Sequence, residues 1–516
     1  MSGIVHVCSQ VRALNPEVRE RVAVIGCGIG GLATALALKN SGCEVVLVER
    51  DPGPPDITPD AAFTDWKRPG VPQFRHAHIL LARLQTVLRD HHPELLAELR
   101  AAGIALSSLD EVLPAPHHSS YRHEAGDEDL QHLWGRRATF EYVARRHVER
   151  LPHVRFVHSA RVEGFVTEQS GGALKVHGLE LSRGGKREVL TADIVVDASG
   201  KQTKSPEWLR NLGVAVEVEG KPSDYVYVCR HYRLKNPAES PPRRGTGGNL
   251  DYLWYGIFYA EHGHFSVAFA CPTEEAELSA SIRSEEGFDA VCKQIEVLDR
   301  WTSLAERTTK VLGAGRFENR WFRYGARGGR QLLGFFAVGD ALAQTNPMYG
   351  RGCSASFVQA HALAETLGHC SEALERSRRY EQRTRALFRT HFDFCLVGDR
   401  MYLARAKRER GLAMPVRDRI IDHLYERAWI PAMKDSLFVA RELVKAMQMR
   451  DVSSFAARML MVFFILLAWV KNAFRREKPA PLALGPARKE LLETLSPLAN
   501  PPPPDKPRSC DFYRVA

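Results

Sequence analysis

The sequence contains no paired cysteines and no segment that marks a secretory signal. Its ten cysteines are scattered over 516 residues without a CxxC pair, which argues against a zinc site or a redox dithiol. The first 20 residues lack the apolar core and the cleavage pattern of a signal peptide. We therefore expect reduced thiols, no bound metal and a cytoplasmic protein.

The chain also lacks the marks of a nucleic-acid-binding protein, although it is basic. Lys and Arg total 71 and Asp and Glu total 61, a net charge of +10. Residues 371–478 carry 23 basic and 13 acidic side chains, so this region holds the whole excess. No basic groove with interleaved aromatic residues or recognition motif accompanies it. The basic region suits either an anionic membrane surface or a solvated helix face.

A glycine-rich turn follows the first predicted strand. Residues 22–25 read as a strand, residues 32–40 as a helix and residues 44–49 as a second strand, the pattern of a βαβ unit. Gly26 permits the tight turn, Gly28 lets the backbone approach a pyrophosphate, and Gly31 lets helix and strand pack closely. Glu49 can accept from both ribose hydroxyls. The pattern predicts a dinucleotide site formed by Gly26, Gly28, Gly30, Gly31, Glu49 and the adjacent Arg50; an unliganded glycine turn is the alternative.

The glycine turn alone does not name the cofactor, because NAD sites and FAD sites share it. A second strand-to-helix connection distinguishes the two. The apolar strand 332–338 ends at Gly339-Asp340, and Pro347, Gly350 and Gly352 precede a helix. Here the chain resembles the FAD-dependent monooxygenases of the aromatic hydroxylase and polyene epoxidase type. The resemblance implies that Asp340 binds the ribityl chain. It also implies that Pro347, Gly350 and Gly352 lie beside the isoalloxazine, where a helix N-terminus can stabilise negative charge. An unrelated strand-loop-helix is the alternative.

Three further stretches fit the same resemblance. Arg137, in Arg-Ala-Thr-Phe-Glu, is similar to the family's Arg-x-x-Leu-Glu, whose arginine lies near the flavin; a solvated arginine is the alternative. Arg75, in Gln-Phe-Arg-His-Ala-His, resembles a basic residue that approaches the flavin in bacterial epoxidase-like members; a surface loop is the alternative. Asp197 and Gly200 look like the variant that closes the nucleotide sheet. Ser199, Thr203 and Pro206 stand where aromatic hydroxylases carry aspartate, serine and arginine, so the docking of NADPH stays open.

These observations predict a mixed α/β (α+β) fold. We expect a flexible N-terminus (1–20), then a Rossmann-like FAD-binding domain built from residues 21–215 and 325–370. Short β-rich runs at 154–157, 161–168, 174–181 and 188–196 would return to it as a meander. An antiparallel β-sheet substrate domain (216–324), a basic helical C-terminal region (371–478) and a Pro-rich surface tail without its own core (479–516) complete the chain. Helical patterns are expected at 78–99 and 274–304.

The resemblance implies FAD as cofactor, NAD(P)H as electron donor and monooxygenation as the reaction. A flavin hydroperoxide formed with O2 would pass one oxygen atom to a small lipophilic alkene or arene, giving epoxidation or hydroxylation. No catalytic residue and no oligomeric state is predicted. Half of the aromatic residues in the second sheet should line the substrate side, drawn from Tyr227, Tyr232, Trp254, Tyr255, Phe258 and Phe265.

Three alternatives use the same scaffold. A reductase of the geranylgeranyl reductase type would not consume oxygen. A flavin-dependent halogenase would bring a Trp-x-Trp-x-Ile-Pro signature, which this sequence lacks. A prenyl-binding chaperone would not need both Glu49 and the Asp340 loop.

A run of twelve apolar residues, 459–470, lies between Arg458 and a group of cations at Lys471, Arg475, Arg476 and Lys478. It is too short to span a hydrocarbon core of about 30 Å. It suits a helix that lies in the membrane interface, or a buried core helix. We therefore consider peripheral contact of residues 459–478 with the inner face of the membrane.

Overall fold

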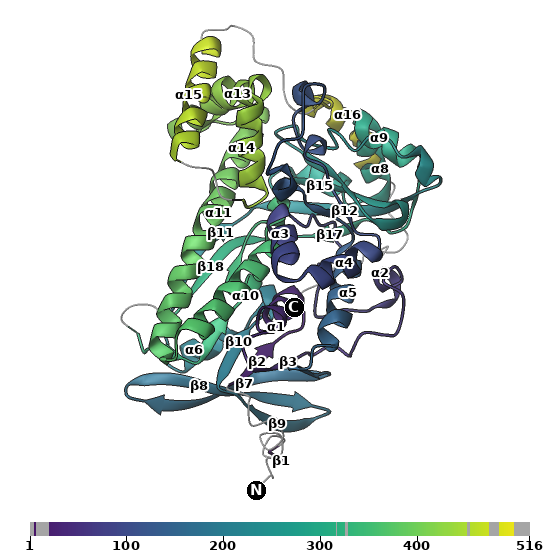
Figure 1. Cartoon of the computed structure of the whole chain (residues 1–516). Helices are drawn as coiled ribbons and strands as arrows, with labels where there is room; N and C mark the ends of the chain where they lie inside the picture. Colours follow the sequence, from purple (N-terminus) through teal and green to yellow (C-terminus); the bar gives the residue numbers. More distant parts are fainter. Residues whose placement is uncertain are drawn as a thin grey trace.

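The computed structural model describes residues 5–6, 20–315, 317–325, 329–450, 455–473 and 484–499. The predicted flexible N-terminus lies outside the described residues apart from 5–6 and 20. So do residues 474–478 of the predicted membrane contact, and 479–483 and 500–516 of the predicted tail. Figure 1 shows an elongated molecule with β-rich layers below and right of a long helix, and a helical bundle above.

A five-stranded parallel sheet forms the half of the molecule that contains the glycine turn, which confirms the Rossmann-like prediction. The strand order is β20-β10-β2-β3-β6. Helices α1 (Ile29–Ala37), α5 (Arg137–Glu149) and α10 (Gly352–His369) pack around it. Its central strands are buried on both faces, which explains their continuous apolar sequences. The strands are β2 (Arg21–Ile25), β3 (Glu44–Val48), β6 (Val154–Val157), β10 (Ile194–Asp197) and β20 (Phe335–Ala337).

A second sheet lies below the first (Figure 1). The antiparallel strands β7 (Ala160–Ser170), β8 (Ala173–Arg183) and β9 (Lys186–Thr191) form it, joined by β1 (Val5–His6) and β19 (Leu332–Leu333). Two predicted strands are wrong as continuous elements, because the chain changes sheet within each. Residues 188–196 divide into β9 and β10, and residues 332–338 divide into β19 and β20. The change from β19 to β20 occurs at Gly334, whose φ is +71°. Only glycine fits there, because a Cβ would overlap the Val176 carbonyl.

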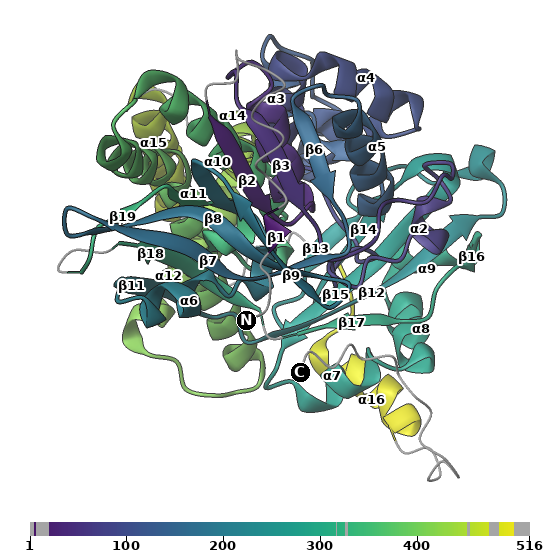
Figure 2. The ribbon, with the colours of Figure 1, turned by 90° about the horizontal axis from the view of Figure 1, so that it is seen from below.

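The predicted substrate-side sheet has six antiparallel strands (Figure 2). Its long strands are β12 (Tyr225–Leu234), β14 (Trp254–Tyr259) and β15 (His264–Pro272), flanked by β13 (Gly247–Asn249), β16 (Ala305–Arg307) and β17 (Leu312–Ala314). The predicted helix 274–304 is three helices on its outer face, namely α7 (Ala276–Ser281), α8 (Glu285–Gln294) and α9 (Glu296–Ser303). A three-stranded sheet of β11 (Val216–Pro222), β18 (Glu318–Tyr324) and β21 (Ala343–Gln344) connects the two halves.

Helices complete the molecule. The predicted helix 78–99 is two helices, α3 (Ala82–His91) and α4 (Pro93–Ala101), because Pro93 starts a new helix. Helix α11 (Ala373–Glu409) runs alongside both halves (Figure 1). The bundle above it contains α12 (Val416–Leu424), a π-helical turn at Tyr425–Trp429, α13 (Ile430–Asp435), α14 (Leu437–Met447) and α15 (Phe455–Asn472).

The Pro-rich tail does more than lie on the surface. Its described part forms α16 (Arg488–Ala499). Leu491 and Leu495 are fully buried in the core of the six-stranded sheet and its helices. Arg488 pairs with Glu275 at 2.8 Å. The described part of the tail therefore adds two leucines to the core of the neighbouring sheet and builds no core of its own. A proline-rich composition does not reveal a short amphipathic helix of this kind.

Candidate functional site

In the glycine turn between β2 and α1, three of the four glycines have close neighbours where a side chain would start, and the fourth, Gly28, has open space there. Gly26 has φ of +93°, and a Cβ there would lie 2.9 Å from the Ala198 carbonyl. A Cβ on Gly31 would overlap the Gly26 carbonyl, and one on Gly30 would touch Ala198 at 3.4 Å. Around Gly28, by contrast, a Cβ would meet no atom within 4 Å. No side chain caps α1, so its N-terminal amides stay available to an anion such as a diphosphate.

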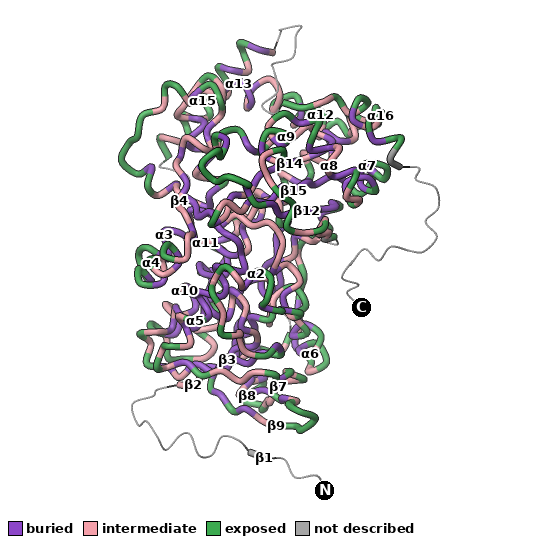
Figure 3. Tube along the Cα trace, turned by 90° about the vertical axis from the view of Figure 1, so that its right-hand side faces the viewer, coloured by how far each residue is buried: buried purple, intermediate pink, exposed green. Residues whose placement is uncertain are grey.

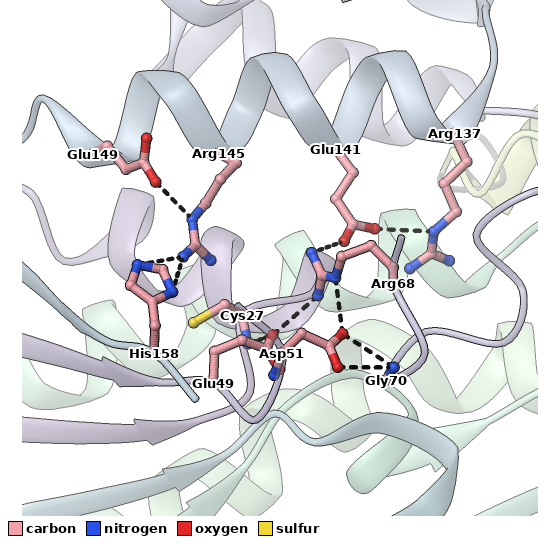
Figure 4. A network of polar contacts seen from close by, with 10 residues as sticks. All are labelled: Cys27, Glu49, Asp51, Arg68, Gly70, Arg137, Glu141, Arg145, Glu149 and His158. Atoms are coloured by element: carbon pink, nitrogen blue, oxygen red, sulfur yellow. Dashed lines mark hydrogen bonds and ion pairs between the residues drawn. The ribbon is translucent and has the colours of Figure 1, made fainter. Parts of the chain in front are cut away.

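Glu49, at the end of β3, lies in a buried ionic network (Figure 4). Its carboxylate accepts hydrogen bonds from the Cys27 amide at 3.1 Å, the Asp51 amide at 3.1 Å and Arg68 Nη2 at 3.0 Å. A carboxylate has about four acceptor sites, so one remains. Glu49 can therefore accept from one ribose hydroxyl in this arrangement rather than from two.

Arg68 was not found by sequence reasoning, and it joins three carboxylates. It pairs with Glu49, with Asp51 at 3.2 Å and with Glu141 of α5 at 2.7 Å. Burial opposes its charge, but the three carboxylates outweigh this and raise the pKa of the guanidinium. Figure 4 shows Arg68 between α5 and the end of β3. Its position in a loop gave no local signal.

Arg137, at the start of α5, contacts Glu141 and a buried histidine. Its Nε donates to Glu141 at 3.2 Å, and its Nη1 lies 3.4 Å from His78 Nε2. Burial and the Arg137 charge lower the pKa of His78 to about 3 and that of His76 to about 4. Both imidazoles are therefore neutral at pH 7.

Asp340, in the short 3-10 turn Gly339–Ala341 after β20, faces the N-terminus of α10. Within the described residues, no donor is hydrogen-bonded to its carboxylate, and burial raises its pKa. A Cβ on Gly352 would lie 3.7 Å from Asp340 Oδ1 and would meet nothing else within 4 Å. Gly350 has φ of +64°, and a Cβ there would overlap Ile79. Pro347 starts the turn before these glycines. An unpartnered acceptor beside an open helix N-terminus fits the polyhydroxyl chain and ring of a flavin.

The remaining residues singled out from the sequence have other partners. Arg75 donates to the carbonyls of Phe63 at 2.7 Å and Thr64 at 2.9 Å, so its guanidinium holds the end of α2 (Ala62–Asp65). Asp197 is fully buried and accepts from the amide and hydroxyl of Ser199 at 2.9 and 2.6 Å. It orders the turn that leads to Gly200, where a Cβ would meet nothing within 4 Å. Arg50 is exposed, 3.5 Å from Gln202. The hydrogen bonds that Arg75 and Asp197 form within the protein thus do not favour direct contact of either side chain with a cofactor.

Asp399 of α11 is a second residue that the sequence did not reveal. It is buried and accepts hydrogen bonds from Asn319 Nδ2 at 2.6 Å, Asn346 Nδ2 at 2.8 Å and the Tyr349 hydroxyl at 3.0 Å. Asn346 and Tyr349 border the turn that precedes Gly350 and Gly352. The C-terminal helical region is therefore connected to the loop beside Asp340.

One face of the six-stranded sheet covers this loop, and we term it the roof face. It comprises Tyr225, Tyr227, Cys229, Trp254, Phe258, Ala268 and Ala270, which pack with Ala77 and Met348. The intervening residues, including Tyr232, Tyr255 and Phe265, pack in the opposite layer with α7, α8 and α9. Register places Cys229, Ala268 and Gly256 side by side in the middle of the roof face, with larger side chains around them. The period-two pattern was predictable, whereas the choice of face was not.

Comparisons with known proteins agree with this geometry. A family model described as FAD dependent oxidoreductase matches residues 21–151, which contain the glycine turn, Glu49 and Arg137. The protein Rv3254 of Mycobacterium tuberculosis is 26% identical over 392 residues, covering 70% of this chain and 76% of that protein.

Solved structures share the fold. The flavin-dependent brominase Bmp2 aligns with a TM-score of 0.58 and 15% identity, over 87% of this chain and 99% of that chain. A probable FAD-dependent monooxygenase from Pseudomonas aeruginosa, PqsL, aligns with a TM-score of 0.52 and 17% identity, over 75% of this chain and 96% of that chain. The expected FAD-binding fold is thereby confirmed.

Proposed function

We propose that the chain is an FAD-dependent oxidoreductase and, more specifically, a monooxygenase; a family model of the first description matches residues 21–151. In this proposal it transfers one oxygen atom of O2 to a small lipophilic arene or alkene, with NAD(P)H as the electron donor. Bound FAD would supply the redox chemistry and the activation of oxygen. The protein would bind and orient the two reactants and keep water away from them.

The residues around the glycine turn and the Asp340 loop are the proposed cofactor site. Gly28 and the N-terminus of α1 would hold the diphosphate, and the free acceptor of Glu49 would bind the adenosine ribose. Asp340 would bind the ribityl chain, while Gly350 and Gly352 would admit the ring. Their support is the open space at Gly28 and Gly352 and the unpartnered Asp340 carboxylate.

The roof face is the observation that carries the proposed substrate class. It is apolar and aromatic, with a row of small residues between Tyr227, Trp254 and Phe258. The two histidines that border it have pKa values lowered by burial, to about 4 for His76 and about 3 for His231. They are uncharged at pH 7, so the roof face presents a neutral surface suited to a flat, uncharged molecule.

Oxygen and pyridine-nucleotide consumption test the reaction class. FAD-loaded protein should oxidise NADH or NADPH faster when a neutral apolar probe, the flat arene naphthalene or the flexible polyene squalene, is added, and one O2 should disappear per oxidised nucleotide. Equal rates with and without oxygen, coupled to saturation of an alkene, would favour a reductase instead.

A halogenase is the second candidate, supported by the alignment over nearly the whole of the brominase structure. The absence of the Trp-x-Trp-x-Ile-Pro signature weighs against it. Repeating the assay with bromide and examining the product mass separates the two reactions.

We also propose that the protein is cytoplasmic and meets the inner face of a membrane through α15. By length and composition this helix could cross a membrane, and 11% of its residues are buried. One side packs in the bundle through Met461, Phe464, Ile465 and Ala468. The other exposes large apolar side chains, among them Phe463 at 57% and Leu466 at 56%. Figure 3 colours parts of α15 as exposed. An exposed apolar face beside Arg458 and Lys471 favours an anionic lipid surface.

A further inference from the structure

A single carboxylate oxygen ties both ends of the turn that precedes the N-terminus of α10. Oδ1 of Asp399 accepts from Asn346 and from Tyr349, the residues on either side of Pro347 and Met348. Oδ2 accepts from Asn319 of β18, whose own amide oxygen accepts from the Asn346 backbone at 2.8 Å. The turn is thus fixed to α11 and to β18 at once.

Helix α11 is shaped for this contact. A Cβ on Gly398 would overlap the Tyr349 hydroxyl, so any other residue there would displace Tyr349. The Tyr349 ring also stands edge-on to Phe394, with centroids 6.0 Å apart and planes at 85°. Two adjacent residues of α11 therefore hold Tyr349: Gly398 leaves room for its hydroxyl, and Asp399 accepts a hydrogen bond from it.

The carboxylate is buried with neutral donors only. In the described part of the chain, no Lys or Arg forms an ion pair with Asp399. Burial raises its pKa to about 6, against the opposing effect of its hydrogen bonds. An ionised carboxylate only accepts, which matches its donors Asn319, Asn346, Tyr349 and the Ser223 hydroxyl, whereas a protonated one carries a donor of its own. Protonation therefore disturbs the set of contacts that holds the turn.

Other groups around Asp399 do not titrate near neutral pH. Burial raises the pKa of Cys395 to about 12 and the pKa values of the three nearby tyrosines above their usual range. Arg351 is buried, and burial lowers its pKa, yet an arginine stays protonated in this range. The tyrosines are Tyr225, Tyr349 and Tyr402.

We propose that Asp399 is a positioning residue for FAD: by holding Asn346 and Tyr349 it places the N-terminus of α10 against the flavin. This role rests on the proposed cofactor site. The N-terminal amides of α10 carry partial positive charge, so their placement determines how well they bind the cofactor. Asp399 acts on the cofactor only through the turn.

The direction of the effect on FAD affinity separates positioning from charge. If Asp399 acted only as a negative charge, Asp399→Asn would strengthen binding of the anionic cofactor. Positioning predicts the reverse, because Asn offers one acceptor oxygen where the donors now share two. Loss of a hydrogen bond to a charged group corresponds to about tenfold weaker binding. Asp393→Asn is the matched control, since Asp393 lies on the same helix and pairs with the partly exposed Arg389 at 2.8 Å.

FAD titration of the apoprotein, with hydrogen exchange of residues 346–352, is the experiment. We expect Asp399→Asn to raise the Kd for FAD about tenfold and to speed exchange in the turn, with Asp393→Asn unchanged. Tyr349→Phe, which removes one donor only, should shift both readouts in the same direction. In the wild type, FAD affinity should fall between pH 7 and pH 5. Asp399→Asn should make this dependence smaller and leave the part that the buried Asp340, whose pKa is also raised, contributes at the cofactor site.

An unchanged or lower Kd in folded Asp399→Asn, or a pH dependence in it as large as that of the wild type, would overturn the proposal. If Asp399→Asn fails to fold, an unaltered Kd for Tyr349→Phe would do the same. Wild-type protein that binds no FAD would refute the cofactor site itself, whereas normal wild-type binding with an unaffected variant would refute only the role of Asp399.

Discussion

Arg68 and Glu49 form a buried ion pair 3.0 Å long between residues 19 positions apart. The same guanidinium also pairs with Asp51 and Glu141. One cation thus pairs with three carboxylates beside the glycine turn and fixes the orientation of Glu49.

Replacing Arg68 by methionine should therefore be strongly destabilising. Three buried carboxylates would lose their only shared cation, and breaking a buried pair costs about 3–5 kcal/mol. Urea unfolding of the apoprotein measures this change. Arg146→Ala, which removes a partly exposed pair with Glu149, should change stability by less than about 1 kcal/mol. Equal losses in the two variants would show that the Arg68 network adds nothing specific.

The two glycines of the turn give a matched pair of alanine variants. Gly31→Ala should destabilise the apoprotein by about 1–3 kcal/mol or more, because the methyl group overlaps the Gly26 carbonyl. Gly28→Ala should leave the apoprotein intact, because its methyl group enters open space, and should weaken FAD binding. Unfolding curves and FAD titration separate the two effects. Tight FAD binding by Gly28→Ala would place the diphosphate elsewhere.

Asp340→Asn should stabilise the apoprotein while weakening FAD binding. Burial raises the pKa of Asp340 above its unfolded value, so its ionisation costs stability as the pH rises through the folded pKa. The gain from Asp340→Asn should therefore be largest at neutral pH and vanish below the unfolded pKa of about 3.9. Unfolding curves over this pH range measure the difference. A variant less stable than the wild type at pH 7 would mean that Asp340 has a protein partner in solution.

The exposed side of α15 predicts lipid binding that can be separated from folding. A triple change of Phe463, Leu466 and Leu467 to serine should abolish sedimentation with phosphatidylglycerol vesicles and leave the fold intact. Ile465→Ser is the control, because Ile465 packs inside the bundle and its loss should destabilise the protein. Wild-type binding should weaken with salt, since the Debye length is about 10 Å at 0.1 M. Wild-type protein that stays in the supernatant at low salt would refute the membrane contact.

The sequence predicted those parts of the site that depend on neighbouring residues. The glycine turn and the Gly339-Asp340 loop are local strand-to-helix connections whose conformations require particular residues in order. The sequence did not predict Arg68 and Asp399, because their roles come from contacts across the fold. Asp399, for example, forms hydrogen bonds with residues 53 and 80 positions away. Neither lies in a motif, and a loop arginine or a helical aspartate is usually solvated.

The same distinction explains the errors in the fold. Residues 188–196 and 332–338 each look like one apolar strand, because β propensity does not register a change of sheet at Gly334 or Asp193. Alternation in β12, β14 and β15 identified two faces, but only the register with neighbouring strands and helices decided that Tyr227 lies in the roof face and Tyr255 in the opposite layer.

Mass spectrometry of the product formed under ¹⁸O2 tests the central claim most directly. FAD-loaded protein, NAD(P)H and a panel of neutral arenes and polyenes, including naphthalene and squalene, would be incubated with labelled oxygen in unlabelled water. The account predicts a product that gains one ¹⁸O atom and is absent when oxygen is withheld. A product that gains two hydrogen atoms without oxygen, or one that gains bromine when bromide is supplied, would contradict it.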